Sequence, residues 1–167
     1  KRLLFDEISK QINHKNAIVI VGSRQVGKTT LMKQIFDEVE SRSKLWFDFD
    51  NPLDQKIFED IDYKNIYERI LKMVNNNKER LFIFIDEIQF FDKEIIILLM
   101  KLRDKGIEIV VAGLDLDFRG IPFGPIPELL ALADEVTKLK AVCFRTGKDA
   151  QYSQRLINGS PAKHTDP

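Results

Sequence analysis

The 167-residue sequence has little of several features that mark particular protein classes. Its single cysteine excludes an internal disulfide framework and fits a reducing compartment, so we expect a cytoplasmic protein. Its 26 basic residues balance 26 acidic ones, which gives no support to nucleic-acid binding through bulk charge. No apolar run approaches the roughly 18–20 residues that span a bilayer, and no signal peptide is visible. What remains is the composition of one globular domain.

Strand-like apolar runs alternate with helix-like segments along the chain. Three of the runs are apolar at successive positions, which indicates strands buried on both faces, as in a parallel sheet covered by helices. The alternation predicts a three-layer α/β domain with a mainly parallel sheet of about five strands and helices on both faces. The predicted strands are 17–21, 45–49, 81–85, 107–112 and 136–143, and the predicted helices are about 2–13, 28–41, 63–74, 92–105 and 125–134.

The first predicted strand is followed by Gly22-Ser23-Arg24-Gln25-Val26-Gly27-Lys28-Thr29, which matches the pattern GxxxxGK[ST] between a strand and a helix. Glycines let successive backbone N–H groups face one concavity, and the N-terminus of the following helix favours negative charge. The pattern therefore predicts a P-loop NTPase fold whose loop binds the phosphates of ATP. Lys28 is expected to reach the β- and γ-phosphates and Thr29 to ligate Mg²⁺. Thr30 completes the predicted phosphate-binding set.

An acidic pair, Asp86 and Glu87, follows the third predicted strand. A carboxylate at the end of a strand beside a phosphate loop is the arrangement that holds Mg²⁺, so Asp86 is predicted to bind the metal directly or through water. Glu87 is predicted to act as a base near the γ-phosphate and to accept a proton from the attacking group. Asp48 and Asp50 end the second strand, and they either face this site or form a solvated loop.

The first half of the chain contains the segments GSRQVGKTTLMKQIF, LWFDFDNP and LFIFIDEIQ. Through them residues 1–89 resemble a stand-alone AAA-type P-loop ATPase. The resemblance implies ATP in the phosphate loop, Mg²⁺ on Asp86 and a hydrolytic water polarised by Glu87. Two features of that family are missing, because Ala112-Gly113-Leu114-Asp115 replaces its small polar sensor residue and no arginine finger is evident.

The second half contains FIDEIQFFDKEI, IVVAGLDLDFRGIPFGPIPELLALADEVTKLKAVC and QRLINGSPAKHTDP. Through them residues 84–167 resemble type II thymidine kinase, with the segments in that family's order. The resemblance implies that Glu87 is the base for the sugar 5′-hydroxyl and that Phe118 stacks near thymine. It also implies that about 152–167 form the first arm of a lasso loop around the nucleoside. Phe90 and Phe123 either line the same slot or pack in the core.

The thymidine kinase resemblance is incomplete at its zinc site, which needs two Cys-x-x-Cys pairs. The first pair keeps Cys143, which we expect to be a buried thiol, and has Thr146 at the partner position. The second pair and the returning arm of the lasso would lie beyond Pro167. Zinc is therefore predicted to be absent. We expect a P-loop domain over 1–143 and a truncated, lasso-like tail over 144–167.

The two resemblances meet at the segment IDEIQ, where strand, acidic pair and sheet position coincide. We interpret the chain as a fusion, engineered or recombinant, of an ATPase front half and a thymidine kinase back half, with a naturally diverged protein as the alternative. Three functions stay open: an Mg·ATP-binding domain with little or no turnover, an ATP:thymidine 5′-phosphotransferase, and an ATP hydrolase. The expected partners are a nucleotide and thymidine. Oligomeric state also stays open, because the kinase family's tetramer interface need not survive the exchanged half.

Overall fold

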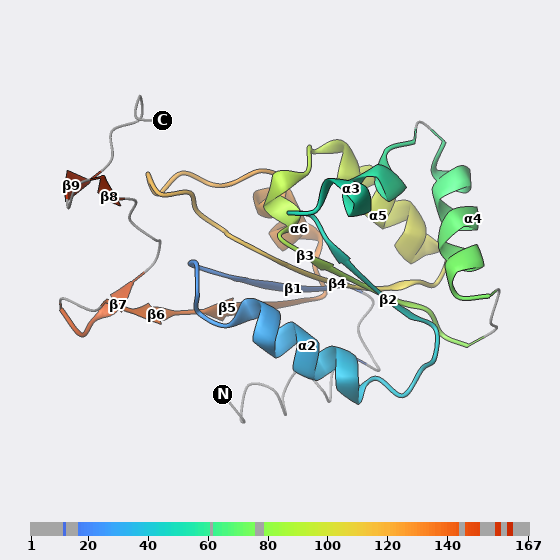
Figure 1. Cartoon of the computed structure of the whole chain (residues 1–167), viewed down its shortest axis with the longest axis horizontal. Helices are drawn as coiled ribbons and strands as arrows, with labels where there is room; N and C mark the ends of the chain where they lie inside the picture. The colour runs from blue at the N-terminus through green and yellow to red at the C-terminus, as the bar shows by residue number, and fades with distance from the viewer. Residues whose placement is uncertain are drawn as a thin grey trace.

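The computed structural model describes residues 12, 17–60, 62–75, 79–143, 146–150, 156–157 and 160–161. A five-stranded sheet lies at its centre, in the order β2-β3-β4-β1-β5, and every neighbouring pair in it is parallel (Figure 1). The predicted parallel α/β fold is thus confirmed. The strands are β1 (Ala17–Gly22), β2 (Lys44–Asp48), β3 (Phe82–Asp86), β4 (Glu108–Gly113) and β5 (Glu135–Leu139).

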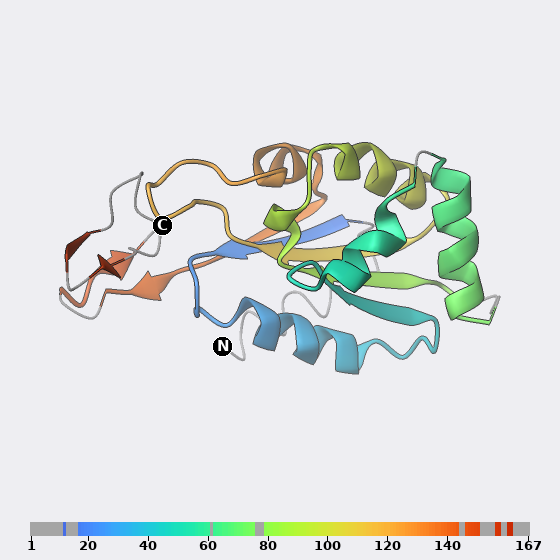
Figure 2. The same cartoon turned by 45° about the horizontal axis from the view of Figure 1, so that its top comes forward.

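Helices cover both faces of the sheet, as predicted. One face is covered by α2 (Lys28–Glu38), and Figure 2 shows the other described helices on the opposite face. A 3-10 turn, η1 (Ile88–Phe90), connects β3 to that second layer. The helices of the second layer are α3 (Pro52–Phe58), α4 (Tyr63–Met73), α5 (Glu94–Asp104) and α6 (Ile126–Leu132).

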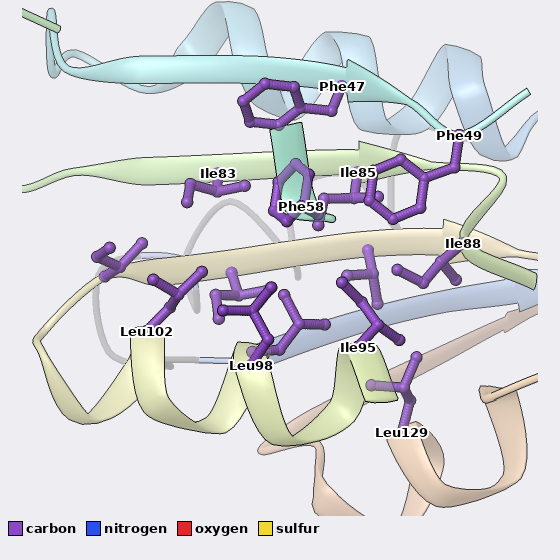
Figure 3. Close-up of a cluster of buried hydrophobic side chains, with 14 of the residues drawn as sticks. Phe47, Phe49, Phe58, Ile83, Ile85, Ile88, Ile95, Leu98, Leu102 and Leu129 are labelled. Carbon is purple, nitrogen blue, oxygen red and sulfur yellow. The ribbon is translucent and has the colours of Figure 1, made fainter. Parts of the chain in front are cut away.

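The hydrophobic core is divided between the two faces, because successive side chains of a strand point to opposite sides of the sheet. On one face Ile18 and Ile20 of β1 pack with Met32 of α2. Burying each such side chain contributes about 1.5–3 kcal/mol, so both layers stabilise the sheet. The opposite face, drawn in Figure 3, is filled by Phe47, Phe49, Phe58, Ile83, Ile85, Ile95, Leu98, Leu102 and Leu129.

Some element boundaries differ from the predictions. Helix α3 was not predicted, although Asn51 marks its start: the Asn51 side chain accepts a hydrogen bond from the Leu53 N–H at 3.1 Å, and Pro52 is the first helical residue. The predicted strand 136–143 is broken at Lys140, because β1 ends at Gly22 and offers no further partner. The predicted helix 2–13 lies outside the described residues, except for the buried Ile12.

After the break at Lys140, β6 (Ala141–Val142) leaves the sheet and forms an antiparallel hairpin with β7 (Asp149–Ala150). Cys143 lies in the turn, where its N–H donates to the Lys148 carbonyl and its carbonyl accepts from Gly147, both at 2.8 Å. Cys143 is partly exposed, so the expectation of a buried cysteine was wrong. Of the predicted tail, the described residues include a second hairpin of β8 (Leu156–Ile157) and β9 (Ser160–Pro161).

Bilayer crossing needs a long apolar helix. Within the described part of the chain, every helix is too short or too polar to traverse a membrane.

Candidate functional site

The predicted site residues come together at one edge of the sheet. Because all five strands are parallel, their carboxyl ends share this edge, which is where open parallel sheets bind ligands (Figure 1). The phosphate-loop sequence 22–29 begins at the last residue of β1, the acidic pair begins at the last residue of β3, and a long loop, 114–124, follows β4.

The loop over 22–29 depends on backbone conformations that glycine favours. Gly22, Gln25 and Gly27 have φ angles of 146°, 63° and 95°, and α2 begins directly after Gly27. Gly22 also lacks room for a side chain, because a Cβ there would lie 2.3 Å from the Leu139 carbonyl oxygen of β5. The first glycine of the pattern is therefore required by a close approach of two strands as well as by its φ angle.

Lys28 is folded back onto this loop and is only 5% exposed. Its Nζ donates to the carbonyl oxygens of Gly22 at 3.1 Å and Ser23 at 3.0 Å. Burial lowers the pKa of Lys28, while the negative charges of Glu87 and Asp86 act in the opposite direction. The Ser23 hydroxyl is also buried and has no hydrogen-bond partner among the described residues. Ammonium and hydroxyl together could serve a bound anion.

Asp86 is 3% exposed and lies beside the start of α2. Its carboxylate accepts hydrogen bonds from the Thr29 hydroxyl and, at 3.0 Å, from the backbone N–H of Glu87. Burial raises the pKa of Asp86 despite the Thr29 hydrogen bond, and the charges of Glu87 and Asp48 raise it further. A divalent cation bound here would stabilise the buried negative charge of Asp86. A carboxylate beside a hydroxyl is a hard oxygen donor set of the kind Mg²⁺ accepts.

Glu87 has a left-handed backbone conformation, with φ 55°, which costs a non-glycine residue about 1 kcal/mol. Its carboxylate accepts a hydrogen bond from the side-chain Nε2 of Gln89. The Oε1 of the same amide accepts from the Leu114 backbone N–H at 2.9 Å. Sequence reasoning assigned no role to Gln89. The available signal was a polar side chain inside the apolar run that follows the acidic pair.

Loop 114–124 carries two of the three aromatic residues singled out from the sequence. The Asp117 carboxylate braces the loop by accepting the N–H groups of Arg119 and Ile121 at 2.8 and 3.0 Å. Phe118 is partly buried and lies under the Arg119 guanidinium, 5.7 Å from the ring centre. Phe123 meets Phe90 edge to face, with ring centres 5.9 Å apart. The structure thus pairs the two residues whose role was left open.

A second buried carboxylate was not predicted. Asp115 follows β4, and one of its oxygens pairs with Lys138 of β5 at 2.7 Å, while the other has no hydrogen-bond partner in the described part of the chain. Since β1 lies between β4 and β5, this ion pair links the two strands on either side of β1.

The two aspartates at the end of β2 differ. Asp48 lies in register with Asp86 of β3, whereas Asp50 is exposed. The alternative left open for this pair is thus decided separately for each residue: Asp48 contributes to the charge at the site edge, and Asp50 belongs to a solvated loop.

Two pockets border the site. One, of about 200 Å³, lies between the start of α2 and the end of β5, and is lined by Val26, Gly27, Thr30, Leu31, Gln34, Leu139 and Lys140. A larger one, of about 690 Å³, lies among α3, α4 and α5 and includes Phe90 in its lining. The larger pocket was not predicted, and none of the phosphate-loop residues lines it.

Most of the chain matches one known protein family. The family model for thymidine kinase matches residues 28–164. The chain belongs to the thymidine kinase family. The match begins inside the phosphate-loop sequence and includes the acidic pair, loop 114–124 and most of the tail. It supports the resemblance drawn from the second half and extends it into the first.

Several solved structures share the fold of this chain. They include a DNA replication initiation factor, at 15% identity and TM-score 0.55 over 87% of this chain and 47% of that chain. C. elegans PCH-2 aligns at 16% identity and TM-score 0.57, over 83% and 43%. Domain III of the Thermotoga maritima replication initiation protein DnaA aligns at 19% identity and TM-score 0.53, over 82% and 60%.

At these identities the likeness shows the fold alone, and the chain spans less than two thirds of each matched structure. The shared fold confirms the predicted three-layer P-loop fold. The AAA-type resemblance of the first half is supported at the level of fold, while the thymidine kinase resemblance is supported at the level of family.

Proposed function

We propose that this chain binds Mg·ATP and transfers the γ-phosphoryl group to the 5′-hydroxyl of thymidine or a close nucleoside analogue, with low turnover. The main support for the proposal is that the phosphate loop, the acidic pair and loop 114–124 are connected to one another at one edge of the sheet. The charges of Lys28, Asp86 and Glu87 act on one another inside the protein, and Gln89 connects them to loop 114–124. Phosphate-binding and nucleoside-binding elements are thereby side by side.

On the phosphate side, the backbone N–H groups of 22–29 and the Lys28 ammonium bind the β- and γ-phosphates. Thr29 and Asp86 hold Mg²⁺, whose charge offsets that of the phosphate oxygens. The unpartnered Ser23 hydroxyl and the raised pKa of Asp86 support a phosphate and a cation here, because each group gains a partner on binding. The 200 Å³ pocket beside α2 receives the nucleotide's remaining parts.

On the acceptor side, Glu87 takes the proton of the 5′-hydroxyl as its oxygen forms a bond to the γ-phosphorus. The bond between that phosphorus and the β–γ bridging oxygen breaks, and ADP leaves. Phe118 lies near the base by family resemblance, and the contact of Phe90 with Phe123 supports a shared aromatic slot.

Low turnover is proposed because the nucleoside side is open. Phe90 is 48% exposed, and Phe118 and Phe123 are only partly buried. Reactions between two bound molecules depend strongly on accurate placement of both, which an exposed slot supplies poorly. Thr146 stands where the family's first zinc-binding pair has its second cysteine, in the same β6–β7 turn as Cys143, so we propose that no zinc stiffens this region.

The decisive experiment incubates the protein with γ-labelled ATP, Mg²⁺ and thymidine and separates the products. Labelled thymidine monophosphate is the expected result. Labelled inorganic phosphate formed equally without thymidine would instead identify an ATP hydrolase, in which Glu87 polarises a water. If neither product forms while Mg·ATP raises the melting temperature, the chain is a nucleotide-binding domain without turnover, and the transfer step is wrong.

We also propose that the chain is a fusion, with an ATPase-like part up to about residue 89 and a thymidine-kinase-like part from about 84, followed by a lasso-like tail over 144–167. The shared IDEIQ segment ends β3 and begins η1, so a junction there leaves strand and acidic pair intact. The family match from 28 to 164 crosses the junction. Comparing 28–83 and 90–164 with the family separately tests the idea, and equal matches from both parts would contradict it.

A further inference from the structure

Gln89 occupies an unusual position among the polar residues of the site. It is only 2% exposed, and both ends of its amide are used. The NH₂ group faces a carboxylate and the oxygen faces a backbone N–H, so the reverse orientation would place oxygen against oxygen and hydrogen against hydrogen. The two partners therefore fix one orientation of the side chain.

Both ends of loop 114–124 also rest on Gln89. At Gly113, immediately before the loop, a Cβ would lie 2.6 Å from the Gln89 Oε1. At Gly124, the last loop residue, a Cβ would lie 2.5 Å from the Gln89 backbone carbonyl oxygen. Because Gly113 and Gly124 have no side chains, both ends of the loop can lie against Gln89. We therefore expect movements of the loop and of Gln89 to be coupled.

We infer that Gln89 is a positioning residue that couples loop 114–124 to the Glu87 carboxylate, so that a nucleoside held by the loop and the base that deprotonates it are aligned through one side chain. The inference rests on the proposed function for its catalytic half. Its structural half, the hydrogen-bonded bridge, is independent of turnover. The two halves can be tested separately.

The bridge is tested by a cycle of thermal unfolding on Q89E, E87Q and the double variant. Q89E sets two carboxylates against each other and is expected to lower the melting temperature. Adding E87Q restores a donor–acceptor pair in reverse order and is expected to recover most of the loss. Q55E is the matched control: Gln55 donates to the Phe49 carbonyl at 2.5 Å, so E87Q should not rescue it. No destabilisation by Q89E, or equal rescue of Q55E, would overturn the bridge.

The positioning role is tested by steady-state kinetics. Q89L is expected to lower kcat about 10- to 100-fold, as for a base displaced by about 1 Å, with the KM for Mg·ATP unchanged. In the E87Q background Q89L should cause no further loss, because its effect acts through that carboxylate. An unchanged kcat in Q89L contradicts the role even if the bridge exists.

Failure of the proposed function has a different signature. If the wild-type chain forms no nucleoside monophosphate, the transfer reaction and the catalytic half of this inference are both wrong. The unfolding cycle still decides whether Gln89 joins the loop to the acidic pair.

Discussion

The two ends of the candidate site are built in different ways. At the phosphate end, Lys28 and Asp86 are 5% and 3% exposed, and Gly22 of the loop lies tightly against Leu139 of β5. At the nucleoside end, loop 114–124 is braced largely by its own Asp117, and its aromatic residues remain partly exposed. The phosphate end is therefore preformed by the core of the protein, whereas the nucleoside end is a loop that contacts the rest of the site through Gln89.

The difference shows where each end obtains its binding energy. Burial opposes the charge on both Lys28 and Asp86, so the folded protein keeps these groups in an unfavourable state that the proposed phosphate and Mg²⁺ would relieve. Sites of this kind commonly reduce stability in exchange for function. The aromatic side chains carry no such penalty, and their contribution depends on how well the loop holds them against a ligand.

Gly22→Ala should have the largest effect if the phosphate end is rigidly preformed. The new Cβ would meet the Leu139 carbonyl at 2.3 Å, and a φ of +146° strains any side chain. We expect a loss of about 2–3 kcal/mol in the free energy of unfolding, measured with urea. Gly106→Ala is the control, since its φ is +80° but nothing lies within 4 Å, and it should cost about 1 kcal/mol. Equal losses would mean that the strand approach is not tight.

Lys28→Ala should remove most of the stabilisation by Mg·ATP. Loss of one charged hydrogen-bond donor to phosphate weakens binding by about 10- to 100-fold. The measurement is the ATP-dependent rise in melting temperature. Lys33→Ala changes an exposed lysine of the same helix and should leave that rise intact. A variant at Lys28 that kept the full rise would show that nucleotide does not bind in this loop.

Phe118→Ala probes the nucleoside end and should act more weakly. Base stacking on an aromatic ring is worth about 1–3 kcal/mol, so the KM for thymidine should rise about 10-fold while the affinity for Mg·ATP is unchanged. Phe90→Ala, at a more exposed ring, should have a smaller effect. If both variants changed ATP affinity instead, the two ends would not be separable.

Asp86→Asn should give the smallest change in stability, and in the favourable direction. Because the pKa of Asp86 is raised, the folded state holds this proton more tightly than the unfolded state, so wild-type stability falls as pH rises from about 4 through the raised value. The variant removes that penalty and should melt about 1–3 °C higher at pH 7 without nucleotide. The gain should shrink towards pH 4, and the Mg²⁺-dependent part of ATP stabilisation should disappear. If the gain in melting temperature were the same at every pH, the raised pKa of Asp86 would not be its cause.

Much of the phosphate end could be predicted from local sequence. The loop pattern, the helix start at Lys28 and the position of Asp86 after an apolar strand are all encoded within a few residues of one another. At the nucleoside end, residues could be predicted from the sequence but their contacts could not. Phe118 was identified by resemblance, whereas the contact between Phe90 and Phe123 is known only from the structure. Helix α3 was missed because Phe58 is the only fully buried one of its seven residues, so its sequence shows no apolar stripe.

The sequence by itself determined the parallel α/β architecture and the phosphate loop, because buried strands read as continuous apolar runs and glycine patterns dictate backbone angles locally. Only the tertiary structure decided which strands are neighbours. The order β2-β3-β4-β1-β5 places β4 beside β3, which lets Gln89 reach Leu114 across 25 residues of sequence, and places β4 and β5 on either side of β1, which lets Asp115 pair with Lys138. Such contacts depend on which strands pair, and strand pairing is set by packing over the whole sheet rather than by any short segment of the chain.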